Sequence, residues 1–143
     1  MAGLNVVRLK GGDPLIFGRG AEEISYLRSY HIDVRVIPGV SSATAIPSSL
    51  GVPLTARDIS SSVAFISGHS KGERGSQPQS IEIPKVDTIV FLMGITKLDI
   101  ILKSLENAAW KDQTPILIIS KGTCEQEKII LGNLKTIAKK VQD

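Results

Sequence analysis

The chain has 143 residues, of which 42% are hydrophobic and 22% are charged, the balance of a globular protein with a sizeable core. Its formal net charge of +3 and its 4% of aromatic residues do not favour a nucleic-acid-binding surface. No apolar run approaches the roughly 18 residues that a membrane-spanning helix needs. The single cysteine, Cys124, excludes an internal disulfide and is typical of a reducing cytoplasm. Only two histidines accompany it, far apart in the sequence, so we expect no metal site.

The opening stretch of the chain predicts a ligand-binding turn. Residues 6–10 are rich in β-branched side chains, which indicates a buried strand, and Gly11, Gly12 and Asp13 then end it. Residues 18–23, Gly-Arg-Gly-Ala-Glu-Glu, make a second turn and begin a helix. In open α/β sheets, small ligands bind at the carboxyl ends of the strands, and glycines there allow close approach to the backbone. We therefore expect a ligand site directly after the first strand.

Strands and helices alternate along the rest of the chain, which predicts an α/β fold with mainly parallel sheets. We expect helices at residues 21–30, 41–46, 97–108 and 134–141, and further strands at residues 33–37, 63–67, 88–93, 115–120 and 128–131. The inward face of the third helix is formed by Leu98, Ile101, Leu102 and Leu105. Asn133 is the expected cap of the last helix. The polar segment 54–62 resembles a linker, so we predict two domains, 1–58 and 59–143, the first with a small core.

The residues alone leave the chemistry open. Residues 18–23 carry two glycines of a dinucleotide-binding fingerprint, but a glutamate at the third glycine position argues against NAD. His69 stands in a glycine-rich segment and is more typical of an ordinary loop residue than of a catalytic base. Arg19 and Arg57 lie in irregular segments, where functional residues are frequent but ordinary exposed arginines are too. Met93, at the end of an apolar strand, is typical of a core residue.

Several sequence blocks together follow the order of a known family. The first, Val-Arg-Leu-Lys-Gly-Gly-Asp-Pro-Leu-Ile-Phe-Gly-Arg-Gly-Ala-Glu-Glu, occupies residues 7–23. The others cover essentially the rest of the chain, at residues 38–43, 51–58, 63–69, 88–94, 122–126 and 132–134. They resemble the tetrapyrrole methylases, in the branch of the uroporphyrinogen-III C-methyltransferases. The Gly-Arg-Gly-Ala-Glu-Glu block separates this branch from relatives that methylate diphthamide precursors, ribosomal RNA or later corrin intermediates.

The resemblance implies two α/β domains with S-adenosyl-L-methionine bound between them, usually in a homodimer. It implies transfer of two methyl groups to ring carbons of uroporphyrinogen III, which gives precorrin-2 for sirohaem and cobalamin, with S-adenosyl-L-homocysteine as the spent cofactor. The positions that match cofactor-binding residues are Gly11, Gly12, Asp13, Ile16, Ser41, Ser42, Met93 and Gly122. Arg19, Glu22 and Arg57 match positions assigned to substrate binding or to removal of the proton from the substrate carbon.

Compared with the family, we expect a chain truncated at both ends. In the family a glycine- and proline-rich cofactor loop precedes the first block, and a strand and a further cofactor loop follow the last one. The expected architecture is therefore tetrapyrrole methylase-like, with two α/β domains of which the first is incomplete. Two alternatives stay open, namely another tetrapyrrole methylase with a different acceptor and a non-catalytic chain that only self-associates.

Overall fold

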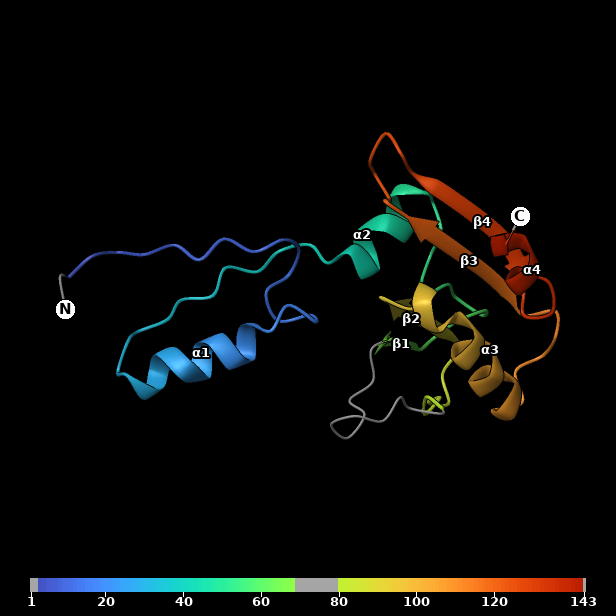
Figure 1. The fold of residues 1–143 in the computed structure, drawn as a ribbon, viewed down its shortest axis with the longest axis horizontal. Helices are drawn as coiled ribbons and strands as arrows, with labels where there is room; N and C mark the ends of the chain where they lie inside the picture. The colour runs from blue at the N-terminus through green and yellow to red at the C-terminus, as the bar shows by residue number, and fades with distance from the viewer. Residues whose placement is uncertain (1–2, 69–79, 143) are drawn as a thin grey trace. The chain divides into compact units, whose positions relative to one another are not determined.

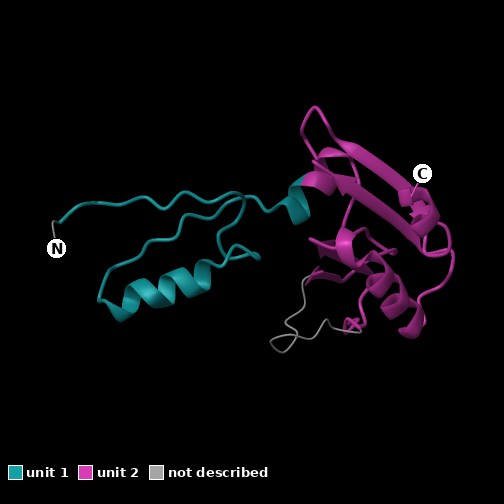
Figure 2. Ribbon diagram, viewed as in Figure 1, with its two compact units in different colours: residues 1–45 teal, residues 46–143 magenta. Residues whose placement is uncertain are grey.

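A computed structural model describes residues 3–68 and 80–142, and His69 with most of its predicted loop lies outside them. The helices and strands are α1 (Gly20–Ser29), α2 (Ser42–Ser49), β1 (Val63–Ser67), β2 (Thr88–Leu92), the 3-10 helix η1 (Ile95–Lys97), α3 (Leu98–Asn107), β3 (Pro115–Ser120), β4 (Lys128–Asn133) and α4 (Ile137–Gln142) (Figure 1). The chain divides into two compact units, unit 1 at residues 1–45 and unit 2 at residues 46–143, and the boundary falls inside α2 (Figure 2). The domain boundary between residues 58 and 59 stays a prediction.

Unit 1 consists of α1, the start of α2 and irregular segments. The predicted helix at residues 21–30 is confirmed by α1, whose first turn carries Glu22 and Glu23, a favourable place for negative charge. The predicted strands at residues 6–10 and 33–37 are wrong, because both segments are irregular. A strand is stabilised by a ladder with a neighbour, and no neighbouring strand pairs with either segment among the described residues.

Unit 2 contains two two-stranded sheets of opposite kind. β1 and β2 are parallel, with Val63 opposite Thr88, as the alternation of elements predicted. β3 and β4 are antiparallel, with Pro115 opposite Asn133, so the expectation of mainly parallel sheets was wrong for this pair. Residues 121–127 join the two strands without a helix, and a parallel crossover needs a dozen or more residues.

The hydrophobic core of unit 2 gathers side chains from α3, α4 and both sheets. The inward face of α3 is confirmed, because Ile101, Leu102 and Leu105 are buried and Leu98 packs against them. The other buried members are Ile81, Leu134 and Ile137, and partly buried side chains of all four strands surround them. The predicted cap and start of the last helix were wrong, because α4 begins at Ile137 and Asn133 ends β4. Oδ1 of Asn133 instead accepts hydrogen bonds from the amide and the hydroxyl of Thr136 and closes the turn at residues 134–136.

Candidate functional site

The glycine turn of unit 1 holds four of the predicted cofactor residues together. Gly12 has a φ of +71°, which favours glycine, and both Gly11 and Gly12 are exposed. Asp13 closes the turn, because its Oδ1 accepts the amide of Leu15 at 2.8 Å and its main-chain carbonyl accepts the amide of Ile16 at 3.4 Å. Gly11, Gly12, Asp13 and Ile16 therefore lie in one short, hydrogen-bonded segment with open backbone at its tip.

A second segment of unit 1 packs against this turn. The amide of Gly39 donates to Oδ2 of Asp13 at 3.3 Å, and a Cβ added at Gly39 would overlap the carbonyl oxygen of Gly12. The predicted Ser41 follows closely and is buried, with its Oγ accepting the amide of Ala43 at 3.2 Å. Ser41 thus acts as the cap of α2, while the neighbouring Ser42 is exposed.

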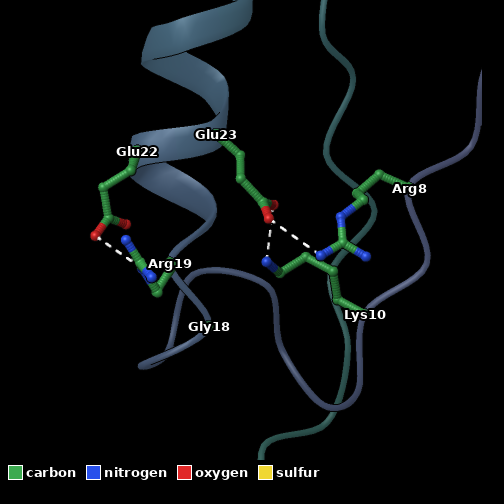
Figure 3. Close-up of a pocket in the computed structure, with 6 residues that line it drawn as sticks. All are labelled: Arg8, Lys10, Gly18, Arg19, Glu22 and Glu23. Atoms are coloured by element: carbon green, nitrogen blue, oxygen red, sulfur yellow. Dashed lines mark hydrogen bonds and ion pairs between the residues drawn. The ribbon is translucent and has the colours of Figure 1, made fainter.

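A hollow of about 400 Å³ lies beside the turn, at the start of α1 (Figure 3). It contains two of the predicted substrate residues, Arg19 and Glu22, whose Nε and Oε1 atoms are 3.5 Å apart. Arg19 has a φ of 58° and Phe17 a φ of 52°, so left-handed backbone flanks Gly18 on both sides. Such a conformation is costly for residues other than glycine and concentrates at functional sites.

The hollow also contains charged residues that the sequence reasoning left out of the site. Nζ of Lys10 lies 2.8 Å from Oε2 of Glu23, and Nη2 of Arg8 lies 3.4 Å from Oε1 of the same carboxylate. The hydrogen bond from Lys10 is the main cause of the lowered pKa of the Glu23 carboxyl. The signal was present in the sequence, because Arg8 and Lys10 are two basic residues at a spacing of two directly before the glycines.

The remaining predicted residues, Arg57, Met93 and Gly122, belong to unit 2. Arg57 is exposed in a turn that is closed by the bridge between Ala56 and Ser60. Met93 follows β2 directly and is 49% exposed, so the interpretation as a core residue was wrong. Whether these three residues complete one site with the turn and hollow of unit 1 stays a prediction.

The backbone is left-handed after both β2 and β3. Met93 has a φ of 57°, and Gly122 stands between Lys121 at 52° and Thr123 at 67°. A Cβ on Gly122 would lie 2.7 Å from a side-chain carbon of Ile46, so α2 packs closely on this loop. Strained backbone at the ends of strands is typical of ligand loops. Met93 itself has this conformation, whereas at Gly122 only the two neighbouring residues have it.

Across residues 3–68 and 80–142, histidine, cysteine and carboxylate side chains form no group of three or more that is arranged to hold a metal ion. In the same part of the chain, every helix is too short or too polar to cross a membrane.

Comparison with known proteins identifies the family of the chain. Residues 1–138 match the family model of the Tetrapyrrole (Corrin/Porphyrin) Methylases. A uroporphyrinogen-III C-methyltransferase from Methanocaldococcus jannaschii is 41% identical over 138 residues, 96% of this chain and 57% of that protein. A siroheme synthase from Hahella chejuensis is 42% identical over 141 residues, 99% of this chain and 30% of that protein.

A solved structure shows the same fold. The crystal structure of uroporphyrin-III C-methyl transferase from Thermus thermophilus complexed with S-adenyl homocysteine aligns with a TM-score of 0.80 at 36% identity, covering 94% of this chain and 58% of that one. The chain thus spans less than two thirds of the length of each of these three relatives. The match over residues 1–138 confirms the predicted family, and the chain belongs to the tetrapyrrole methylases.

Proposed function

We propose that this chain carries out, within its enzyme, the S-adenosyl-L-methionine-dependent C-methylation of uroporphyrinogen III to precorrin-2, a step toward sirohaem and cobalamin. The observation that carries the proposal is the Arg19–Glu22 pair in a hollow beside the glycine turn of a tetrapyrrole methylase. Relatives named for this enzyme support it, one at 41% sequence identity and one solved structure at 36% sequence identity.

The glycine turn fits the cofactor that the family implies. Gly11 and Gly12 present exposed backbone without side chains, and Asp13 fixes their conformation through the amides of Leu15 and Gly39. S-adenosyl-L-methionine supplies an activated methyl group, so the protein's task is chiefly to position the reactants. We assign Gly11, Gly12, Asp13, Ile16, Ser41, Ser42, Met93 and Gly122 to cofactor binding.

The charged residues suit an acidic tetrapyrrole. Uroporphyrinogen III carries eight carboxylates, and a guanidinium group binds a carboxylate through two parallel hydrogen bonds. Arg19 offers such a group, with its side chain 82% exposed. Glu22 lies beside it and can accept, at a carboxylate oxygen, the proton that the tetrapyrrole loses when a ring carbon is methylated. Arg57, exposed on its turn, is the further substrate residue that we assign.

We further propose that the enzyme is a cytoplasmic homodimer with domains divided near residues 58 and 59. The single cysteine agrees with a reducing compartment. The polar composition of residues 54–62 is the basis for the domain boundary.

The proposal is tested by methyl transfer from labelled S-adenosyl-L-methionine to uroporphyrinogen III, followed by mass analysis of the tetrapyrrole. We expect the wild type to add two methyl groups, and Arg19→Gln and Glu22→Gln each to lower the rate by about 100-fold. Arg28→Gln, which removes an exposed arginine from the last turn of α1, is the matched control and keeps the rate. Methylation of a different tetrapyrrole in place of uroporphyrinogen III would contradict the proposed acceptor.

A second candidate is self-association without catalysis. It is favoured by an exposed apolar stretch in unit 1, because Leu4, Val6, Val7 and Leu9 are each 79–87% exposed. Light scattering on the wild type and on Val7→Lys tests it. This candidate would be favoured over the enzyme by two results together. The wild type forms multimers that the Val7→Lys substitution dissociates, and the wild type transfers no methyl group.

A further inference from the structure

The charges of the hollow are not balanced. Three cations, Arg8, Lys10 and Arg19, line it together with two carboxylates, Glu22 and Glu23, which leaves one positive charge in excess (Figure 3). Lys10 pairs with Glu23 at 2.8 Å, and Arg19 contacts Glu22 at 3.5 Å. Arg8 and Lys10 share the single carboxylate of Glu23, so the excess positive charge lies on these two residues.

The hydrogen bonds of Arg8 leave much of its guanidinium group available. Its Nη2 is 3.4 Å from a Glu23 oxygen, but the other oxygen of that carboxylate is already bound by Lys10 at a shorter distance. Its Nη1 donates to the carbonyl of Leu9 at 3.0 Å. A guanidinium group has five N–H donors, and the others have no partner among the described residues. The Arg8 side chain is 71% exposed and points toward the Glu23 carboxylate (Figure 3).

We propose that Arg8 is a carboxylate-binding residue that, with Arg19, holds acidic side groups of the tetrapyrrole in this hollow. The identity of the ligand rests on the proposed function. Two exposed guanidinium groups on one hollow match a ligand that carries several carboxylates around its rim. Lys10 supports Arg8 indirectly, because it binds the carboxylate that would otherwise neutralise the guanidinium charge.

Binding measurements test this role without relying on turnover. The probe is uroporphyrin III, the stable oxidised octacarboxylate, titrated into the chain and followed by absorbance, with S-adenosyl-L-homocysteine titrated separately by calorimetry. The variants are Arg8→Gln, which removes the charge, and Arg8→Lys, which keeps the charge but loses the two-pronged geometry. Arg28→Gln is the matched control, since Arg28 is exposed on α1 but does not line the hollow.

We expect Arg8→Gln to weaken uroporphyrin III binding by about tenfold, Arg8→Lys to weaken it less, and both to leave the S-adenosyl-L-homocysteine affinity unchanged. Equal porphyrin affinity in the wild type and Arg8→Gln would overturn the role of Arg8 and leave the proposed function intact. A wild type that binds S-adenosyl-L-homocysteine but not uroporphyrin III would overturn the hollow as the porphyrin site. A wild type that binds neither would overturn the proposed function itself. Arg8→Lys separates a binding loss from a folding loss, because it retains the charge at this exposed position.

Discussion

Nζ of Lys10 lies 2.8 Å from Oε2 of Glu23, and this ion pair joins the residue before the glycine turn to the first helical turn of α1 (Figure 3). The Lys10 side chain is only 15% exposed, so the lysine end of the ion pair is shielded from solvent. It connects the segment assigned to the cofactor with the segment assigned to the substrate. The pair therefore couples the geometry of the two binding segments, together with the Arg8–Glu23 contact and the hydrogen bond from the Gly20 amide to the Pro14 carbonyl.

Removing this ion pair is expected to loosen the glycine turn. Lys10→Met keeps the length of the side chain but leaves Glu23 without its shortest hydrogen bond. We expect faster hydrogen exchange of the Leu15 and Ile16 amides, which donate to Asp13, and up to about fivefold weaker binding of S-adenosyl-L-homocysteine. Lys103→Met, at an exposed position of α3, is the control. Unchanged exchange of the Leu15 and Ile16 amides in Lys10→Met would show that the pair does not support the turn.

Asp87 predicts how the stability of unit 2 depends on pH. Its Oδ2 accepts hydrogen bonds from the amides and hydroxyls of Ser61 and Ser62, which fixes the segment before β1 next to the start of β2. The amide of Ser61 is the main cause of the lowered pKa of Asp87, below its ordinary value of 3.8. A lowered carboxyl pKa stabilises the fold above the unfolded value, and this contribution is lost as the pH falls through the folded value.

We therefore expect the urea midpoint of the wild type to fall as the pH drops below about 3.8, and Asp87→Asn to show a weaker fall over the same window. At neutral pH Asp87→Asn should be the less stable of the two, because it loses the ionised acceptor. Asp112→Asn is the control, since the Asp112 side chain has no hydrogen bond among the described residues. Parallel pH profiles for the wild type and Asp87→Asn would contradict this account.

Ser104 predicts a stability loss inside the core of unit 2. Its buried Oγ accepts the amide of Ile81 at 2.9 Å and donates to the carbonyl of Ile100 at 2.8 Å. Ser104→Ala leaves the Ile81 amide without a partner, which costs about 1–3 kcal/mol of unfolding free energy. Urea denaturation measures the loss, and Ser49→Ala, which removes an exposed hydroxyl bonded to Ile46, should cost less. A Ser104→Ala variant as stable as the wild type would show that the Ile81 amide finds another partner.

At Gly68, which directly follows β1, close backbone packing leaves no room for a side chain. A Cβ at this position would lie 2.7 Å from the carbonyl oxygen of Met93. This oxygen is a backbone atom, so it cannot move away by a side-chain rotation. Gly68→Ala should therefore lower the unfolding free energy by about 1–3 kcal/mol and shift Met93. In Gly132→Ala the nearest atom is the flexible end of Ile137 at 3.1 Å, so this control should cost less. Equal losses in the two variants would contradict the backbone clash.

Local patterns in the sequence were sufficient to predict much of unit 2. The spacing of Ile101, Leu102 and Leu105 gave α3 its buried face, and the apolar runs became β1, β2 and β3. The antiparallel pairing of β3 with β4 was missed because the alternation of strands and helices suggested parallel sheets throughout. The short connection at residues 121–127 is the feature that indicates an antiparallel pair.

In unit 1 the same patterns failed for the strands, and the binding roles of its turn residues stay a prediction. Residues 6–10 have the composition of a strand, yet strand formation depends on a neighbour that the segment itself cannot specify. The turn at Gly11, Gly12 and Asp13 was predicted, because glycines mark it directly, whereas the ion pair between Arg19 and Glu22 emerged only from the structure. The contact of Lys10 with Glu23 links positions far apart in the sequence, and only the path of the chain brings them together.

The central claim is tested most directly by calorimetric titration of the 143-residue chain with S-adenosyl-L-homocysteine. The matched pair of variants is Gly12→Ala and Gly3→Ala, since both glycines have left-handed backbone, at φ of +71° and +63°, but only Gly12 lies in the proposed cofactor turn. The account predicts micromolar binding by the wild type and by Gly3→Ala, and binding weakened about fivefold or more in Gly12→Ala. No heat of binding from the wild type, or equal affinity in Gly12→Ala and Gly3→Ala, would contradict it.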